Sequence, residues 1–167
     1  MTNKPFQEVK AKFLDAWKSM GDTWGIARPM AQIHGLLMIS EKPLSTDDVM
    51  RELAISRGSA NTNLRALVGW GIVRRVHRAG DRKEYFESEK DTWAMLCTVV
   101  RERKRREIEP VIRHLEDCLR EGERAPAVFR ERLESLLDIM KAVDLLMSQL
   151  AEQQTNKVLP RLLKFLR

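Results

Sequence analysis

The sequence has little cysteine, little glycine, few aromatic residues and no long uncharged apolar segment. Its two cysteines, Cys97 and Cys118, lack the spacing of a disulfide framework, which argues against a secreted, cystine-stabilised protein and fits a reducing cytoplasm. Eight glycines and an aromatic content of 6% argue against an all-β fold. Because no stretch approaches 18 uncharged apolar residues and the N-terminus lacks a signal-peptide pattern, we expect a cytoplasmic protein without a membrane span.

The sequence also lacks the motifs of common enzyme classes. It contains no P-loop, no G-x-G-x-x-G, no H-E-x-x-H and no G-x-S-x-G. The histidines are scattered, and His34 lies in an apolar segment where we expect a hydrogen-bonded core residue. His114 and Cys118 share a helix face, but two ligands do not make a zinc site unless a second chain adds two more. We therefore predict a protein that is not an enzyme and holds neither cofactor nor metal.

Basic residues, in contrast, are abundant and unevenly placed. The 167 residues include 30 Lys and Arg against 24 Asp and Glu, a formal net charge of +6. Residues 55–83 contain seven of the bases and a single acid, Asp81, so this stretch alone accounts for a charge of +6. Such focused positive charge is typical of a phosphate-binding surface, with nucleic acid as the simplest partner.

The pattern of residues 44–88 predicts a winged helix-turn-helix. A helix is expected to start at Ser45 or Thr46, and Ser56 is expected to cap a second helix that reaches Trp70. Gly71 suits the left-handed position that ends this helix. Two β-prone runs around a turn at residues 79–82 then predict a basic hairpin. This order of elements places one helix in a DNA major groove.

The outer face of the second helix carries small or hydrogen-bonding side chains and no acid. Because asparagine pairs with adenine and arginine with guanine, this face is expected to contact base edges. The alternative is an ordinary solvated helix face. The residues expected at base edges are Arg57, Ser59, Asn61, Thr62 and Asn63.

The remaining bases of this module are expected to hold the DNA backbone. Arg82 lies at the tip of the hairpin and is expected in the minor groove, while Asp81 is expected to orient Arg82 or the turn. Phosphate contacts fix the register of the protein without specifying sequence. The residues expected to make them are Arg65, Arg74, Arg75 and Lys83.

Several short motifs resemble one family. Gly80-Asp81-Arg82 resembles the wing tip of the MarR-type transcriptional regulators, and Arg57-Gly58-Ser59 with Asn61 and Asn63 resembles the recognition helix of their GbsR-like branch. The segments Met20-Gly21, Trp24-Gly25 and Trp70-Gly71-Ile72-Val73 also resemble that branch. The resemblance is specific over residues 20–93 and weak beyond them. It implies a homodimeric bacterial DNA-binding regulator, often a repressor that responds to a small molecule.

The resemblance also implies a class of effector. The GbsR-like branch is associated with choline and osmoprotectant control, so the effector would be a quaternary ammonium such as choline. Binding such a cation requires an aromatic cage. Trp17, Trp24 and Trp93 are the candidates for its walls, and the alternative is that they are core residues. Cys97 or Cys118 is either a redox sensor or a small buried apolar residue.

We expect a mainly α-helical chain with a small β-hairpin wing, in three parts. They are an N-terminal dimerisation helix (1–28), the winged helix-turn-helix (29–90) and a C-terminal helical dimerisation region (91–167). In the last part, Asp91 is expected to cap a helix that Pro110 interrupts, and a final helix is expected over residues 158–166. Its apolar stripes exceed what a small winged unit covers, which favours a second copy over folding back on the same subunit.

The sequence thus predicts a homodimeric, sequence-specific DNA-binding transcriptional regulator that acts as a ligand-responsive repressor, with recognition helices in successive major grooves and wings in minor grooves. The alternative is a winged-helix interaction module whose basic face binds a protein partner.

Overall fold

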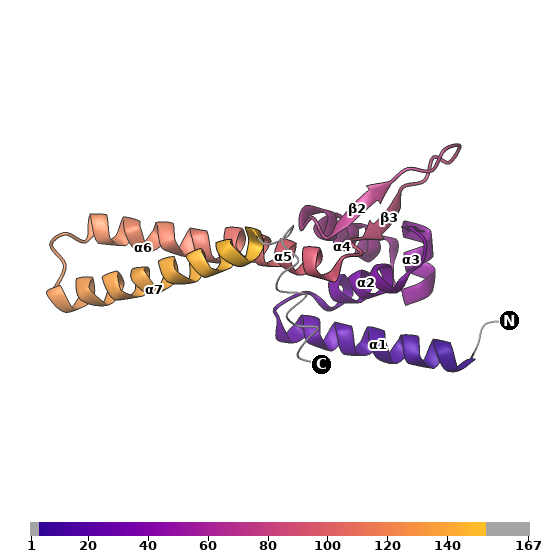
Figure 1. Cartoon of the computed structure of the whole chain (residues 1–167), viewed down its shortest axis with the longest axis horizontal. Coiled ribbons are helices and arrows are strands. Elements are labelled where there is room, and N and C mark those ends of the chain that lie inside the picture. Colours follow the sequence, from indigo (N-terminus) through magenta and orange to yellow (C-terminus); the bar gives the residue numbers. More distant parts are fainter. Residues whose placement is uncertain (1–3, 153–167) are drawn as a thin grey trace. The chain divides into compact units, whose positions relative to one another are not determined.

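The computed structural model describes residues 4–152 and divides the chain into two compact units, Met1–Lys90 and Asp91–Arg167 (Figure 1). The described residues form helices and one small sheet, which confirms the predicted mainly α-helical, winged helix-turn-helix fold. The helix predicted over residues 158–166 lies outside the described residues. Within the described part, every helix is too short or too polar to cross a bilayer.

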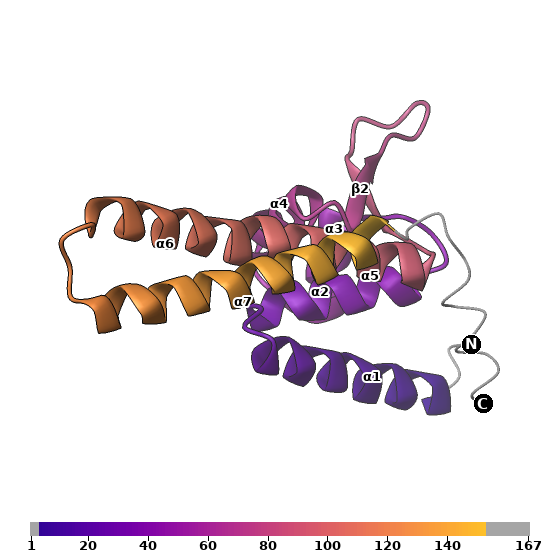
Figure 2. The same cartoon turned by 60° about the vertical axis from the view of Figure 1, so that its left-hand side comes forward.

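The first unit begins with two helices that lie side by side, α1 (Lys4–Thr23) and α2 (Arg28–Ile39) (Figures 1 and 2). Gly25, at φ +69°, allows the sharp connection between them. The helices pack closely through two glycines. A Cβ on Gly21 would lie 2.5 Å from the Cβ of Ala31, and one on Gly35 would lie 2.9 Å from Cδ1 of Trp17.

The helix-turn-helix follows as α3 (Thr46–Leu53) and α4 (Arg57–Gly69). Ser45 caps α3 in a reciprocal capping box with Asp48, whose amide lies 3.2 Å from the serine hydroxyl oxygen. Ala54 takes a left-handed conformation in the turn, and Ser56 accepts from the amide of Ser59 to cap α4. Both predicted caps are confirmed, because each depends on a local side chain that satisfies a free backbone donor.

The hairpin consists of β2 (Val73–Val76) and β3 (Tyr85–Ser88), and its turn extends beyond the helices of this unit (Figure 2). The sequence predicted two strands, and the structure adds a third. β1 (Leu44–Ser45) pairs antiparallel with β3, so the strand order is β1-β3-β2. A two-residue strand has too few residues to show alternation, which is why its sequence gave no signal.

The second unit contains α5 (Thr92–Arg103), the π-helical segment η1 (Lys104–Ile108), α6 (Glu109–Glu121) and α7 (Ala127–Glu152). Asp91 caps α5 as predicted by accepting from two backbone amides. The predicted interruption at Pro110 takes the form of η1, in which the amide of Glu109 donates to the carbonyl of Lys104 five residues back. The helices α6 and α7 run alongside each other as a hairpin (Figure 1).

Candidate nucleic-acid interface

The helix α4 has one buried face and one polar face. Ala60, Leu64 and Leu67 are at most 1% exposed and hold the helix against the core of the first unit. On the remaining surface, the sequence-predicted contact residues divide into two groups. Three are exposed, namely Arg57, Thr62 and Arg65, and three are partly buried, namely Ser59, Asn61 and Asn63.

The partly buried polar residues of α4 bond within the protein. The side-chain amide of Asn63 donates to the carbonyl of Ser59 at 2.8 Å, one turn back in the same helix. The hydroxyl of Thr46, at the start of α3, lies 3.4 Å from Oδ1 of Asn61 and donates to it. Asn61 therefore has a fixed position beside α3, whereas Asn63 is engaged with its own helix.

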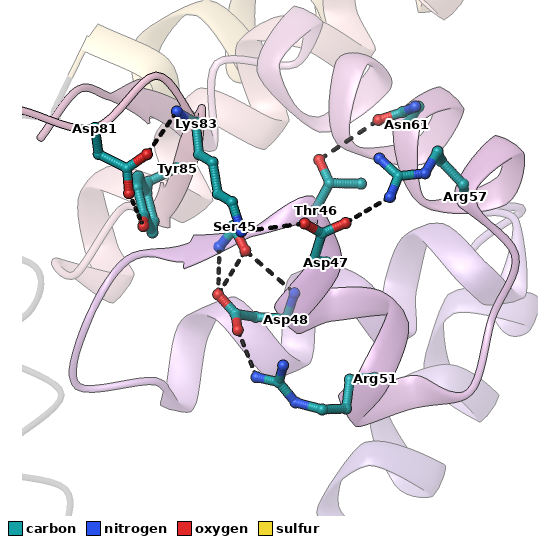
Figure 3. Close-up of polar contacts among 10 residues, drawn as sticks. All are labelled: Ser45, Thr46, Asp47, Asp48, Arg51, Arg57, Asn61, Asp81, Lys83 and Tyr85. Carbon is teal, nitrogen blue, oxygen red and sulfur yellow. Dashed lines mark hydrogen bonds and ion pairs between the residues drawn. The ribbon is translucent and has the colours of Figure 1, made fainter.

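Asp81 orders the turn of the wing (Figure 3). One carboxylate oxygen accepts from the backbone amide of Lys83 at 2.9 Å, and the other accepts from the hydroxyl of Tyr85 at 2.7 Å. The bond from the Lys83 amide, followed by that from Tyr85, lowers the pKa of Asp81. Gly80, at φ +80°, provides the left-handed step of the turn. Arg82 next to it is exposed at the tip.

Arg78 stabilises the base of the wing. Its guanidinium lies 4.0 Å from the centroid of the Tyr85 ring and donates to the carbonyl of Pro43 at 3.1 Å. This arginine contributes to the positive charge of the module, but its contacts join the hairpin to the segment before α3.

Three acids lie among the predicted phosphate contacts. Arg74 pairs with Glu87 directly across the sheet at 2.9 Å, and Arg75 pairs with Glu84 at 3.4 Å. The Arg74 guanidinium is the main reason that the pKa of Glu87 is lowered. The third acid, Asp47, pairs with two cations.

These acids correct the charge argument. The window of residues 55–83 ends just before Glu84 and Glu87, and it starts after Asp47 and Asp48. Over residues 44–88 there are eight bases and six acids, so the net charge of the module is +2. The surface is therefore a set of exchangeable ion pairs and not a purely cationic patch, because exposed pairs are each worth only about 0–1 kcal/mol.

Asp47 is the site residue that the sequence analysis missed. Its carboxylate lies 2.7 Å from Nη2 of Arg57, at the start of α4, and 3.4 Å from Nζ of Lys83, on the wing (Figure 3). The three side chains line an open hollow of about 200 Å³ together with Ser45, Thr46 and Glu84. Asp47 is 10 residues from Arg57 and 36 from Lys83 in the sequence, so no helix or strand periodicity could have predicted these contacts.

The three candidate cage tryptophans have different surroundings. Trp17 donates from Nε1 to Nδ1 of His34 at 3.3 Å, and its ring centroid lies 5.6 Å from that of the tilted Phe13 ring, which favours a packing role for this residue. Trp24 is 50% exposed and directly follows α1, at the start of the α1–α2 connection. Trp93 is partly buried at the start of α5 in the second unit. A shared cage of the three remains a hypothesis.

The two cysteines differ in exposure. Cys97 is fully buried, donates from Sγ to the carbonyl of Leu150 at 3.4 Å, and has a pKa raised by burial. That environment favours the neutral thiol of a core residue over a reactive thiolate. Cys118 is exposed on α6. Across residues 4–152, no three His, Cys, Asp or Glu side chains gather as a metal site.

Known proteins similar to this chain are transcriptional regulators. The HTH-type transcriptional repressor GbsR of Bacillus subtilis (strain 168) is 22% identical over 112 residues, which are 67% of this chain and 62% of the relative. The HTH-type transcriptional regulator MmpR5 of Mycobacterium tuberculosis (strain ATCC 25618 / H37Rv) is 26% identical over 84 residues, 50% of this chain and 51% of the relative. The chain thus matches between half and two thirds of the length of these relatives. No family model matches it.

The fold agrees with this likeness. A crystal structure of a transcriptional regulator superimposes with a TM-score of 0.72 at 21% sequence identity, covering 87% of this chain and 97% of that one. At this identity the match concerns the fold. Together with the two sequence relatives, it confirms the resemblance seen in the sequence: the chain has a winged-helix fold and is similar to MarR/GbsR-like transcriptional regulators.

Proposed function

We propose that the protein is a homodimeric, sequence-specific DNA-binding transcriptional regulator that acts as a ligand-responsive repressor in the cytoplasm. The observation that carries the proposal is a capped helix, α4, whose exposed Arg57, Thr62 and Arg65 lie in the same unit as a hairpin with an exposed Arg82 at its tip. A helix and a wing of this kind enter a major groove and an adjacent minor groove. The names of the two sequence relatives support the same function.

The proposed contacts divide into two classes. Residues on α4 would contact base edges, with Arg57, Thr62 and Asn61 as the main candidates. Asn63 and Ser59 are weaker candidates, because the side-chain amide of Asn63 already donates to the carbonyl of Ser59. Arg65, Arg74, Arg75 and Lys83 would hold phosphates, and Arg82 would enter the minor groove. Arg74, Arg75 and Lys83 must first leave Glu87, Glu84 and Asp47, an exchange that exposed ion pairs permit at low cost.

Homodimerisation is supported by uncovered apolar side chains on α7. Ile139 and Leu146 are seven residues apart on one helix face and are 58% and 65% exposed, while Val128 and Leu145 are 59% and 58% exposed. Phe6 and Val9 on α1 are similarly exposed at 58% and 63%. A second copy would cover such surface, and two copies would present two recognition helices roughly 34 Å apart.

Regulation would follow from the spacing of the two recognition helices. A small molecule that binds one spacing better shifts the population toward it. By its family resemblance, the proposed effector is a quaternary ammonium such as choline, with Trp17, Trp24 and Trp93 as candidate aromatic contacts. Isothermal titration calorimetry with choline tests this assignment, since unchanged binding by Trp24→Ala and Trp93→Ala variants would contradict it.

Selection of duplexes from a random library by the purified protein tests the proposed function. We expect a pseudo-palindromic consensus with half-sites one helical turn apart. Recovery of no enriched sequence, together with no duplex binding at low salt, would contradict the proposal. That outcome would favour the alternative, in which the basic face binds a protein partner.

A further inference from the structure

Asp47 lies where three segments of the proposed interface meet. It is the second residue of α3, whose start is fixed by the capping box of Ser45 and Asp48. One of its partners, Arg57, is the first residue of α4, and the other, Lys83, belongs to the wing. The backbone of Lys83 is itself held by Asp81. A single carboxylate therefore links both helices of the helix-turn-helix to the wing (Figure 3).

The geometry leaves much of the arginine available to a ligand. Only Nη2 of Arg57 contacts Asp47, and its side chain is 64% exposed. A guanidinium has five N–H donors, so an arginine held by one carboxylate can still pair through other donors with O6 and N7 of guanine. Holding the side chain in advance also removes part of the conformational entropy lost on binding.

The same carboxylate opposes contacts with phosphate alone. Its negative charge lies beside Arg57 and Lys83, so a phosphate must compete with Asp47 for both cations. The carboxylate also repels the approaching phosphate. These pairs are exposed, with Asp47 at 42% and Lys83 at 59%, so the competition is reversible.

We propose that Asp47 is a specificity-determining residue that positions Arg57 toward a base edge and weakens sequence-independent binding. This inference rests on the proposed DNA-binding function. Asp47 would act through its two cations and not through direct contact with a base. Its substitution should therefore change the ratio of specific to random binding, which a general change of charge would leave unaltered.

The test compares Asp47→Asn with wild type by fluorescence anisotropy, using a duplex selected by the wild-type protein and a random-sequence duplex of equal length. Asparagine retains the size of the side chain and removes its charge, and the capping box of Ser45 and Asp48 is left intact. We expect random-duplex affinity to rise about three- to tenfold, as two exposed ion pairs no longer compete with phosphate. We expect the ratio of selected to random affinity to fall about tenfold or more.

Asp22→Asn is the matched control. Asp22, in the last turn of α1, pairs with Arg28 at the start of α2, so this change removes one exposed acid and one arginine pair without altering the interface. We expect it to leave the ratio unchanged. In an Arg57→Gln background, Asp47→Asn should no longer lower the ratio, because its partner at the base edge is gone. Melting temperatures of all variants verify that they are folded.

The outcomes separate the two proposals. If wild type prefers its selected duplex and Asp47→Asn keeps that preference, the inference about Asp47 is wrong and the proposed function stands. An equal fall in the ratio for Asp22→Asn would also overturn it, by assigning the effect to net charge. If neither wild type nor variant binds duplex DNA, the proposed function and the inference built on it both fail.

Discussion

His34 forms a buried polar chain between α1, α2 and the wing. Its Nδ1 accepts from the indole of Trp17, and its Nε2 lies 3.3 Å from the hydroxyl oxygen of Ser88 at the end of β3. An indole can only donate, so Nδ1 is unprotonated and the neutral ring carries its proton on Nε2. The Ser88 hydroxyl is then left to donate to a carbonyl, with Glu89 at 3.3 Å and Ile72 at 3.5 Å.

Burial lowers the pKa of His34 to about 4 from 6.5. Since the folded-state pKa is the lower one, the unfolded chain binds the proton first, and stability is lost as pH falls from 6.5 toward 4. The full shift corresponds to about 3 kcal/mol. We expect urea unfolding at pH 7 and pH 5 to show about 2 kcal/mol of this loss in wild type and a smaller loss in His34→Gln. Equal losses in the two proteins would contradict the buried, neutral histidine.

Arg57 and Arg75 represent the two proposed classes of DNA contact. Arg57→Ala should cost about 1–3 kcal/mol on the selected duplex and less on random DNA, because a bidentate base contact is lost. Arg75→Ala should weaken both duplexes alike and make the slope of log K against log salt shallower by about 0.9. Anisotropy titrations in a salt series measure both effects. Equal losses on both duplexes for Arg57→Ala would refute the division into two classes.

At the scale of the element, close packing of α1 on α2 depends on Gly35. A methyl group there would meet Cδ1 of Trp17 at 2.9 Å, and the tryptophan is held by its bond to His34. Gly35→Ala should therefore lower the free energy of unfolding by about 1–3 kcal/mol. Gly58→Ala in α4 is the control, since a Cβ there meets nothing within 4 Å and should stabilise the helix by up to about 1 kcal/mol.

Chemical denaturation of the two glycine variants measures these opposite changes. A stability equal to wild type for Gly35→Ala would mean that α1 can move away from α2 without loss. In that case the contact through Trp17 would not fix the position of α1 in the first unit.

The elements that could be predicted are those that local chemistry determines. Ser45, Ser56 and Asp91 cap helices where the sequence places a short acceptor before an apolar run. Gly71 takes the left-handed position, at φ 70°, after α4. Pro110 interrupts the helix because it lacks an N–H, although its sequence does not specify the π-helical form of η1.

The parts of the site that could not be predicted depend on tertiary contacts. Pairing of β1 with β3, and of Asp47 with Lys83, joins residues about 40 positions apart with no periodic pattern. The pairing of Arg74 with Glu87 follows from the strand register, which the sequence alone left open. The sequence therefore identified the cations of the site, and the structure was needed to show which acids accompany them.

At the scale of the whole molecule, the proposal requires two copies. Leu146→Glu or Ile139→Glu places a charge on the uncovered face of α7 and should shift a dimer toward monomer in sedimentation equilibrium. Arg124→Gln, in the exposed turn between α6 and α7, changes the charge by the same amount outside that face and should leave the dimer intact. A dimer that survives both leucine and isoleucine substitutions would place the interface elsewhere.

The resemblance to the GbsR-like branch supplied the class of function, and the sequence relatives and the fold bear out that resemblance. The contacts of Asn63, Arg78 and Asp81 separate side chains that build the winged helix-turn-helix from those left exposed for the proposed contact with DNA.

The most direct test of the central proposal is the affinity of the full chain for its selected duplex and for a scrambled duplex between about 50 and 200 mM salt. The account predicts tighter binding of the selected duplex at every salt concentration, a steep fall in both affinities with salt, and loss of the preference in an Arg57→Ala, Asn61→Ala double variant. Equal affinity for both duplexes, or binding that salt does not weaken, would contradict it.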